Sequence, residues 1–295
     1  MPHPFPHLAQ RLFNVPLAIR PDKAEIIVAA LAQRLGIAQL VRLDGRVVAF
    51  DGDGDDSTGA GDPADGYDVV GGIAIVPVAG TLVHKLGTLR PFSGMTGYDG
   101  IRANLLAAAA DPAVTAIMLD VDSPGGEVSG CFDLADTIFR LRAAKPIWAV
   151  LSEGAYSAAY ALASACARVI VPATGGVGSI GVITMHVDFS QALAAGGVTV
   201  TLIHYGDRKA DFADTAPLSA PARTRAQADV DSMGAMFDAL VARHRGLPAA
   251  RIKGFQAATF MGSDGVAAGL ADAVMPPDQA FRALAQLASQ KGTGR

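Results

Sequence analysis

The sequence predicts an α/β protein in which a mostly parallel sheet is covered by helices. Two observations carry this prediction. The 295 residues are 51% hydrophobic and 18% charged, which is enough apolar material for a large buried core. From residue 70 onward, short apolar runs rich in β-branched residues alternate with runs of helical periodicity, an alternation typical of βαβ units.

The expected elements follow from these runs in chain order. A long helix is expected from Ser219, a suitable N-cap, to Arg245, with Gly246 as the C-cap. The apolar stripe of this helix includes His244, which we interpret as a packing residue. The expected strands are 72–81, 114–123, 146–152, 168–172, 181–187 and 198–206, and the shorter helices are 98–110, 129–144, 156–167 and 189–197.

Two regions are expected along the chain. Residues 1–66 are interpreted as a small N-terminal helical element, centred on 24–35, followed by an acidic, glycine-rich linker, and residues 67–295 as the main domain. Alternating aspartates within the linker resemble a calcium loop, but Asp56 stands where such a loop needs its turn glycine. We therefore expect no metal site there.

Composition argues against several classes of protein. The net charge of −4 and the scattered basic residues do not favour a nucleic-acid partner. The apolar run 154–167 is too short for a membrane span, and the N-terminus does not resemble a secretory signal, so we expect no integral membrane segment and a cytoplasmic location. Cys131 and Cys166 lie in apolar runs and are expected to be reduced and buried.

Three polar or glycine-rich segments follow predicted strands. The segment 122–126 contains Gly125 and Gly126, whose backbone could turn and aim amides at a developing oxyanion. Ser157 stands at a strand-to-helix junction, which suits a nucleophile, although a capping serine would look the same. Lys209 follows the predicted strand 198–206, where burial would have to lower its pKa for it to act as a base; otherwise it is a surface lysine paired with a neighbouring aspartate.

A glycine pattern at 176–181 has the spacing of a dinucleotide-binding loop. The residues that follow it, Val182 and Ile183, continue a strand pattern where such a loop requires a helix. We therefore expect no nucleotide cofactor, and no other cofactor is expected.

Four motifs together carry a family resemblance: SPGG at 123–126, GAYSAAY at 154–160, GSIGV at 178–182 and GDRKAD at 206–211. In this order and spacing they resemble the signal peptide peptidase A family of serine proteases, which has the Clp protease and crotonase fold of repeated ββα units. Within that family, LDVDSPGG, TLIHYGDRK and the N-terminal RLFNVPLAIRPDK are similar to the head maturation, or capsid assembly, proteases of phages and prophages.

The resemblance implies roles for five residues. Ser157 would be the nucleophile and Lys209 the general base, with Ser179 bonded to the lysine amine. The amides of Gly126 and Ala158 would form the oxyanion hole.

The resemblance also implies the biological setting. It implies a serine endopeptidase that cleaves scaffold, capsid or portal proteins during phage or prophage head assembly, acting as a homo-oligomer in which neighbouring subunits complete the pocket. The substrate is expected to lie extended along the backbone after Gly126. Tyr156 and the segment after Lys209 depart from the family pattern.

Four alternatives stay open at this point. The chain could be a bacterial peptidase that degrades signal peptides, or a catalytically inactive capsid-assembly protein. The fold alone would also fit a crotonase-like acyl-CoA enzyme. A Clp-type triad would use Ser157 with His186 in place of Lys209.

Overall fold

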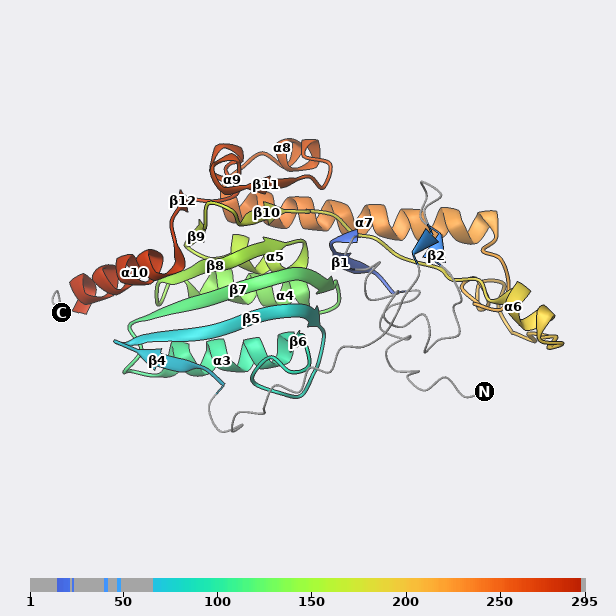
Figure 1. Ribbon diagram of the computed structural model, residues 1–295, viewed down its shortest axis with the longest axis horizontal. Coiled ribbons are helices and arrows are strands. Elements are labelled where there is room, and N and C mark those ends of the chain that lie inside the picture. The colour runs from blue at the N-terminus through green and yellow to red at the C-terminus, as the bar shows by residue number, and fades with distance from the viewer. Residues whose placement is uncertain (1–14, 22, 24–39, 42–46, 49–65, 293–295) are drawn as a thin grey trace.

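The computed structural model describes residues 15–21, 23, 40–41, 47–48 and 66–292. The helix expected at 24–35 and nearly all of the linker lie outside the described residues, so the division at residue 66 stays a prediction. The described part of the chain forms a ten-stranded sheet with helices on both faces (Figure 1). A separate two-stranded pair consists of β2 (Leu40–Val41) and β3 (Val47–Val48).

Three long parallel strands form the centre of the sheet: β5 (Ile73–Val83), β7 (Ala116–Glu127) and β8 (Ile147–Tyr156). The strands that join them in parallel are β6 (Met95–Gly97), β9 (Arg168–Val171), β10 (Gly176–Gly178) and β12 (Ala273–Val274). The antiparallel additions are β1 (Leu17–Ile19), β4 (Asp68–Val70) and β11 (Thr259–Met261). The predicted mostly parallel α/β sheet is therefore confirmed.

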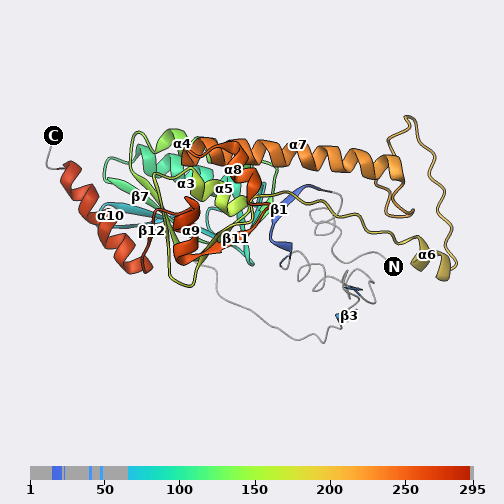
Figure 2. The ribbon, with the colours of Figure 1, turned by 90° about the horizontal axis from the view of Figure 1, so that it is seen from above.

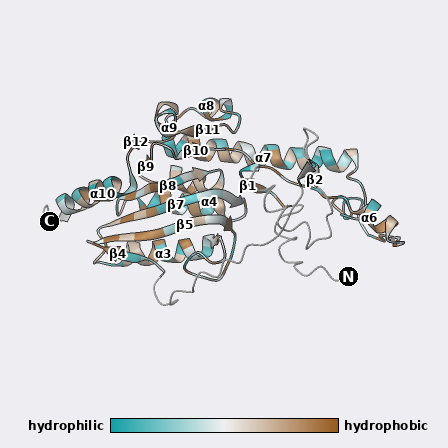
Figure 3. Ribbon diagram, in the orientation of Figure 1, coloured by the Kyte–Doolittle hydropathy of each residue, from teal (hydrophilic) through white to brown (hydrophobic). Residues whose placement is uncertain are grey.

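Side chains of β7 alternate between two cores, as the period of a strand requires. Ile117, Leu119 and Val121 are fully buried in the larger core, and Met118 belongs to a smaller core on the other face. The larger core includes residues of α3 (Tyr98–Ala110), α4 (Cys131–Leu141), α5 (Ala158–Ser164) and α7 (Ala220–Arg245), whereas α10 (Pro277–Gly292) covers the smaller one. Figure 3 shows the apolar residues gathered in these central strands.

Helix α7 has the predicted ends. The Ser219 hydroxyl accepts a 3.2 Å hydrogen bond from the Ala222 amide, and Gly246 ends the helix in the left-handed conformation with φ of 65°. His244 packs as predicted: its ring stacks on Phe139 with 4.7 Å between centroids. Two short helices, α8 (Ala249–Gly254) and α9 (Gly262–Ala268), follow α7 in the chain.

Two strand predictions are wrong. Residues 181–187 form only an isolated bridge, between Ile183 and Leu17, and residues 198–206 form no strand. The sequence of 198–206 has the β-branched residues of a strand, but no described strand lies beside it to supply hydrogen bonds. Ile203 is 96% exposed as a consequence. The helix expected at 189–197 is present as α6 (Ser190–Ala195).

Residues 186–219 form what we call the arm, which consists of α6 and two extended legs. Figures 1 and 2 both show the arm beyond the N-terminal end of α7, outside the sheet. The legs are joined where the Phe189 amide donates a 2.7 Å hydrogen bond to the Asp214 carbonyl. An ion pair between Asp211 and Arg225 ties the second leg to α7.

The cysteine prediction holds, because Cys131 and Cys166 are both free and buried. None of the helices in the described ranges has both the length and the apolar character needed to cross a membrane.

Candidate functional site

Ser157 lies where β8 ends and α5 begins, and its backbone is strained. Its φ of 55° and ψ of −119° fall in a region that residues other than glycine rarely adopt, at a cost of about 1–3 kcal/mol. The Ser157 amide donates a 2.8 Å hydrogen bond to the Gly178 carbonyl, and the Ser157 carbonyl accepts a 3.0 Å bond from the Ala161 amide. A strained serine on a strand-to-helix turn is also how the nucleophile elbow of α/β-hydrolases presents its hydroxyl.

The end of β7 lies beside Ser157. The segment 123–126 was expected to be a loop, but it continues the strand as far as Glu127, with a register shift between Val121 and Ser123. Gly125 has φ of 106°, and a Cβ on it would lie 3.0 Å from the Cβ of Ser157. The missing side chain at Gly125 therefore lets the two backbones approach each other.

Ser179 is close to Ser157 through the same hydrogen bond, because it directly follows Gly178. It is buried, has φ of 54°, and donates its amide to the Ala258 carbonyl at 2.9 Å. Ser157 is also buried, with 1% of its surface exposed, and its hydroxyl lies 3.4 Å from the Gly181 carbonyl, to which it donates. The structure thus brings Ser157, Ser179, Gly126 and Ala158 together.

Lys209 lies elsewhere, on the arm. It is exposed, and its amide donates to the Gly206 carbonyl at 3.1 Å. The cavity beside it, of about 390 Å³, is lined by arm residues only, among them Leu202 and Phe212. Figure 1 shows the arm, which carries Lys209, away from the junction of β8 and α5 where Ser157 lies, so the dyad stays a prediction. Of the two aspartates that could pair with this lysine at the surface, Asp207 and Asp211, the second pairs with Arg225 instead.

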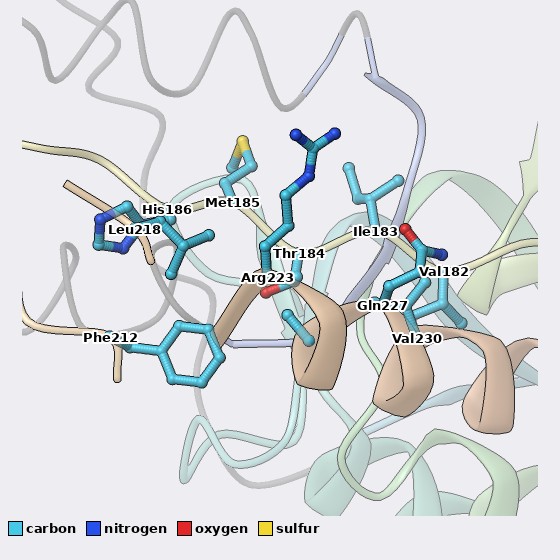
Figure 4. A pocket seen from close by; sticks show the side chains of 11 residues that line it. Val182, Ile183, Thr184, Met185, His186, Phe212, Leu218, Arg223, Gln227 and Val230 are labelled. Carbon is cyan, nitrogen blue, oxygen red and sulfur yellow. The ribbon is translucent and has the colours of Figure 1, made fainter. Parts of the chain in front are cut away.

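His186, the alternative base, also lies on the arm. Its Nε2 is 3.3 Å from the Ala216 carbonyl. A cavity of about 380 Å³ separates the segment 182–186 from the first half of α7, and His186, Phe212 and Arg223 line it (Figure 4). Among the residues that the structure describes, no cluster of metal-ligating side chains is found.

Strand β1 is the part of the site that the sequence analysis missed. Leu17–Ile19 pairs antiparallel with Gly125–Glu127, beside Ser157. The signal was a short apolar run between Pro16 and Pro21, since the residue before a proline is pushed toward extended backbone.

Tyr156 departs from the family pattern, and the structure shows how its ring is accommodated. A Cβ on Gly176 would lie 3.1 Å from the ring carbon Cζ of Tyr156, and one on Gly154 would lie 3.0 Å from the same atom. Two glycines on neighbouring strands therefore leave room for the ring. The Arg20 guanidinium lies 4.6 Å from the ring centroid, which connects the residue after β1 to the end of β8.

Comparisons with known proteins point to one family. The profile of the family described as Peptidase family S49 matches residues 140–291. The chain is 44% identical over 285 residues to the head-tail preconnector protein GP5 of Enterobacteria phage P21, a match that covers 95% of this chain and 57% of that protein. It is 40% identical over 277 residues to the capsid assembly protease C of Escherichia phage lambda, covering 90% of this chain and 62% of that protein.

The chain thus spans somewhat less than two thirds of the length of these relatives. Among solved structures, a ClpP1 mutant from Listeria monocytogenes superposes with a TM-score of 0.42 at 12% identity, covering 68% of this chain and 90% of the other.

Proposed function

Because the chain belongs to peptidase family S49, we propose that it is a serine endopeptidase in which Ser157 is the nucleophile and Lys209 the general base. The observation that carries the proposal is the strained backbone of Ser157 at the β8–α5 junction. Strain of this kind persists where the surrounding structure holds it, and it gathers at functional sites.

The proposed mechanism has two steps. Lys209, in its neutral form, takes the hydroxyl proton of Ser157 as the oxygen attacks the peptide carbonyl, while the amides of Gly126 and Ala158 stabilise the oxyanion. Lys209 then gives the proton to the leaving amine, and water hydrolyses the acyl-enzyme. Ser179 follows Gly178, whose carbonyl accepts the hydrogen bond from the Ser157 amide. From this position Ser179 would orient the lysine amine.

A second copy of the chain would supply the lysine. Residues 198–206 have the composition of a strand but no strand partner among the described residues, and their apolar side chains are exposed, with Leu202 at 51% and Ile203 at 96%. An exposed segment of strand composition has backbone groups that can pair with a strand of another chain. We propose that the arm docks on a neighbouring copy and carries Lys209 to the Ser157 of that copy.

The proposed substrates are scaffold, capsid or portal proteins of a phage or prophage head. The names of the two relatives, a capsid assembly protease and a head-tail preconnector protein, favour this class. A polypeptide in extended form can bind through main-chain hydrogen bonds to the edge of a strand, such as the end of β7 beside Ser157.

Co-expression with candidate scaffold and capsid proteins, followed by intact mass measurement, tests the activity. The wild type should release fragments, and Ser157→Ala should release none. Ser152→Ala is the matched control, because Ser152 lies exposed on the same strand and should leave processing unchanged. Unchanged processing by Ser157→Ala would show that the chain is not the protease.

The choice of base is tested separately. Lys209→Arg keeps the positive charge but cannot give up its proton at neutral pH, so it should be as inactive as Lys209→Ala. His186→Ala should keep turnover within a few fold of the wild type. An inactive His186 variant together with an active Lys209→Ala would favour the triad instead.

A further inference from the structure

Strand β1 lies along the end of β7, on the edge that β8 occupies further upstream; among the described strands, β1 alone pairs with this stretch of that edge. Further upstream, this edge of β7 pairs with β8, as far as the pair of Ser123 with Ala155. There β8 ends and the chain turns into α5, so β8 does not extend along Gly125–Glu127. Leu17–Ile19 fills that position, in antiparallel orientation.

The other side of β1 is paired as well. Leu17 exchanges two backbone hydrogen bonds of 2.8 Å with Ile183, one in each direction. On the β7 side, the Arg20 amide donates to the Pro124 carbonyl at 3.0 Å, and the Val128 amide donates to the Pro16 carbonyl at 3.3 Å. The segment is thus inserted between two backbones, in the manner of a peptide bound by strand addition.

These bonds place the Ala18 carbonyl opposite Gly126. Hydrogen-bonded pairs alternate along an antiparallel ladder, and the bonds of Arg20 and Val128 flank the Ala18–Gly126 pair on either side. The Gly126 amide therefore points at the Ala18 carbonyl. A Cβ built on Gly125 would clash with this carbonyl oxygen and would also lie 3.0 Å from the Cβ of Ser157. The Ala18 carbonyl is therefore close to Ser157.

The Ala18 carbonyl faces the Gly126 amide, the proposed oxyanion donor, and lies beside Ser157, the proposed nucleophile. The scissile carbonyl of a substrate would lie at this position. We propose that β1 is an intramolecular pseudo-substrate strand, which occupies the substrate groove and has to leave it before a substrate strand can bind. The proposal rests on the proposed function only in naming this groove as the substrate site.

Burial and chain connectivity explain why β1 would inhibit. Leu17, Ala18 and Ile19 are 4%, 0% and 4% exposed, and Ser157 beneath them is 1% exposed. A groove of one strand's width cannot hold β1 and a substrate together. Because β1 belongs to the same chain, it competes with a peptide at a high effective concentration. The apparent affinity for the peptide is then the intrinsic affinity multiplied by the fraction of molecules whose groove is open.

Peptide binding to a Ser157→Ala protein tests the proposal without any catalysis. The probe is a fluorescent peptide with the sequence of residues 14–21, NVPLAIRP, and the readout is fluorescence anisotropy on the full chain. Adding Ala18→Asp puts a charge at a fully buried position and should expel β1, so that the peptide binds at least about tenfold more tightly. Val69→Asp, at an exposed position on β4, is the control and should leave binding unchanged.

A reversible lock provides a second test if the Ala18→Asp protein does not fold. Leu17 and Glu127 form a non-hydrogen-bonded pair, in which the Cα atoms of an antiparallel ladder lie about 4.5 Å apart and a disulfide can form. Leu17→Cys with Glu127→Cys, in the Ser157→Ala protein, should lose peptide binding when oxidised and regain it when reduced. The native cysteines are buried and do not compete.

The proposal is overturned if the oxidised and the reduced proteins bind the peptide equally well, or if a folded Ala18→Asp protein binds no more tightly than its parent. Neither measurement needs the Ser157 hydroxyl or Lys209. A chain without protease activity could therefore still pass these tests, and an active protease could fail them, so the two proposals fail separately.

Discussion

Ser157 and Ser179 directly follow two adjacent parallel strands, and their φ angles are almost the same, at 55° and 54°. Gly178, the last residue of β10, is in register with Tyr156 of β8, and its carbonyl accepts the Ser157 amide at 2.8 Å. The carboxyl ends of neighbouring parallel strands are where α/β proteins place their sites. Two serines with positive φ at one such edge support the proposal that the chemistry takes place there.

Gly125→Ala should remove activity by crowding this centre. The new Cβ would lie 3.0 Å from the Cβ of Ser157, and a displacement of about 1 Å costs a well-oriented reaction about 100-fold in rate. Gly71→Ala is the matched control: its φ is also positive, at 58°, but a Cβ there meets nothing within 4 Å. Both variants should lose about 1–2 kcal/mol of stability through their positive φ, measured by urea unfolding, and Gly125→Ala should lose more, because its Cβ also meets the carbonyl oxygen of Ala18. Equal activity in the two would show that Gly125 is needed only for its conformation.

His244 should make stability depend on pH. Burial lowers its pKa to about 4, helped by the charge of Arg243 and opposed by Asp136. The unfolded chain takes up this proton near pH 6.5 and the folded chain only near pH 4, so the contribution is fully present above pH 6.5 and is lost as the pH falls toward 4. The loss is about 3 kcal/mol at most.

Urea unfolding between pH 7.5 and 4.5 measures this loss. His244→Phe keeps a ring against Phe139 and removes the titration, so its stability should fall less over that range than the stability of the wild type. The Ser164 hydroxyl keeps its 2.8 Å bond to the Ala161 carbonyl in that variant. Parallel curves for the two proteins would rule out His244 as the source of the pH dependence.

Local sequence signals predicted the ends of the long helix and the central strands of the sheet. Ser219 and Gly246 cap α7 where they were expected to, because caps act within one turn of a helix. The apolar runs 72–81 and 146–152 became central strands, since each is long enough to be buried on both faces.

The predictions that failed concern pairing, which a single segment does not encode. Residues 198–206 have strand composition but no ladder partner among the described residues, and the short run 17–19 pairs with a strand more than a hundred residues away. For the site, the motif at Ser157 predicted a strand-to-helix junction but not the strain of its backbone. The position of Lys209 on an exposed arm could not follow from its spacing to Ser157, because spacing along a chain does not fix where two residues lie in the fold.

Ile203→Asp should weaken self-association and leave the folded chain intact. The side chain is 96% exposed, so the substitution should change the free energy of unfolding by no more than about 0.5 kcal/mol. If the arm docks on a neighbouring copy as proposed, sedimentation velocity should show an oligomer for the wild type and smaller species for the Ile203 variant. Leu106→Asp, at an apolar position 49% exposed on α3, is the control and should assemble like the wild type. An unchanged oligomer in the Ile203 variant would mean that the arm does not form the contact.

Mixing two inactive variants should restore activity if the arm of one copy serves the Ser157 of the next. Ser157→Ala keeps Lys209, and Lys209→Ala keeps Ser157, so a site built from one copy of each has both groups. In a ring of head-to-tail contacts with random mixing at equal amounts, about one quarter of the sites combine them, and the rate should reach about that fraction of the wild type. Replacing either partner by the double variant should abolish the recovery. A dyad formed within one chain would leave every mixture inactive, even when mass measurement shows that mixed oligomers have formed.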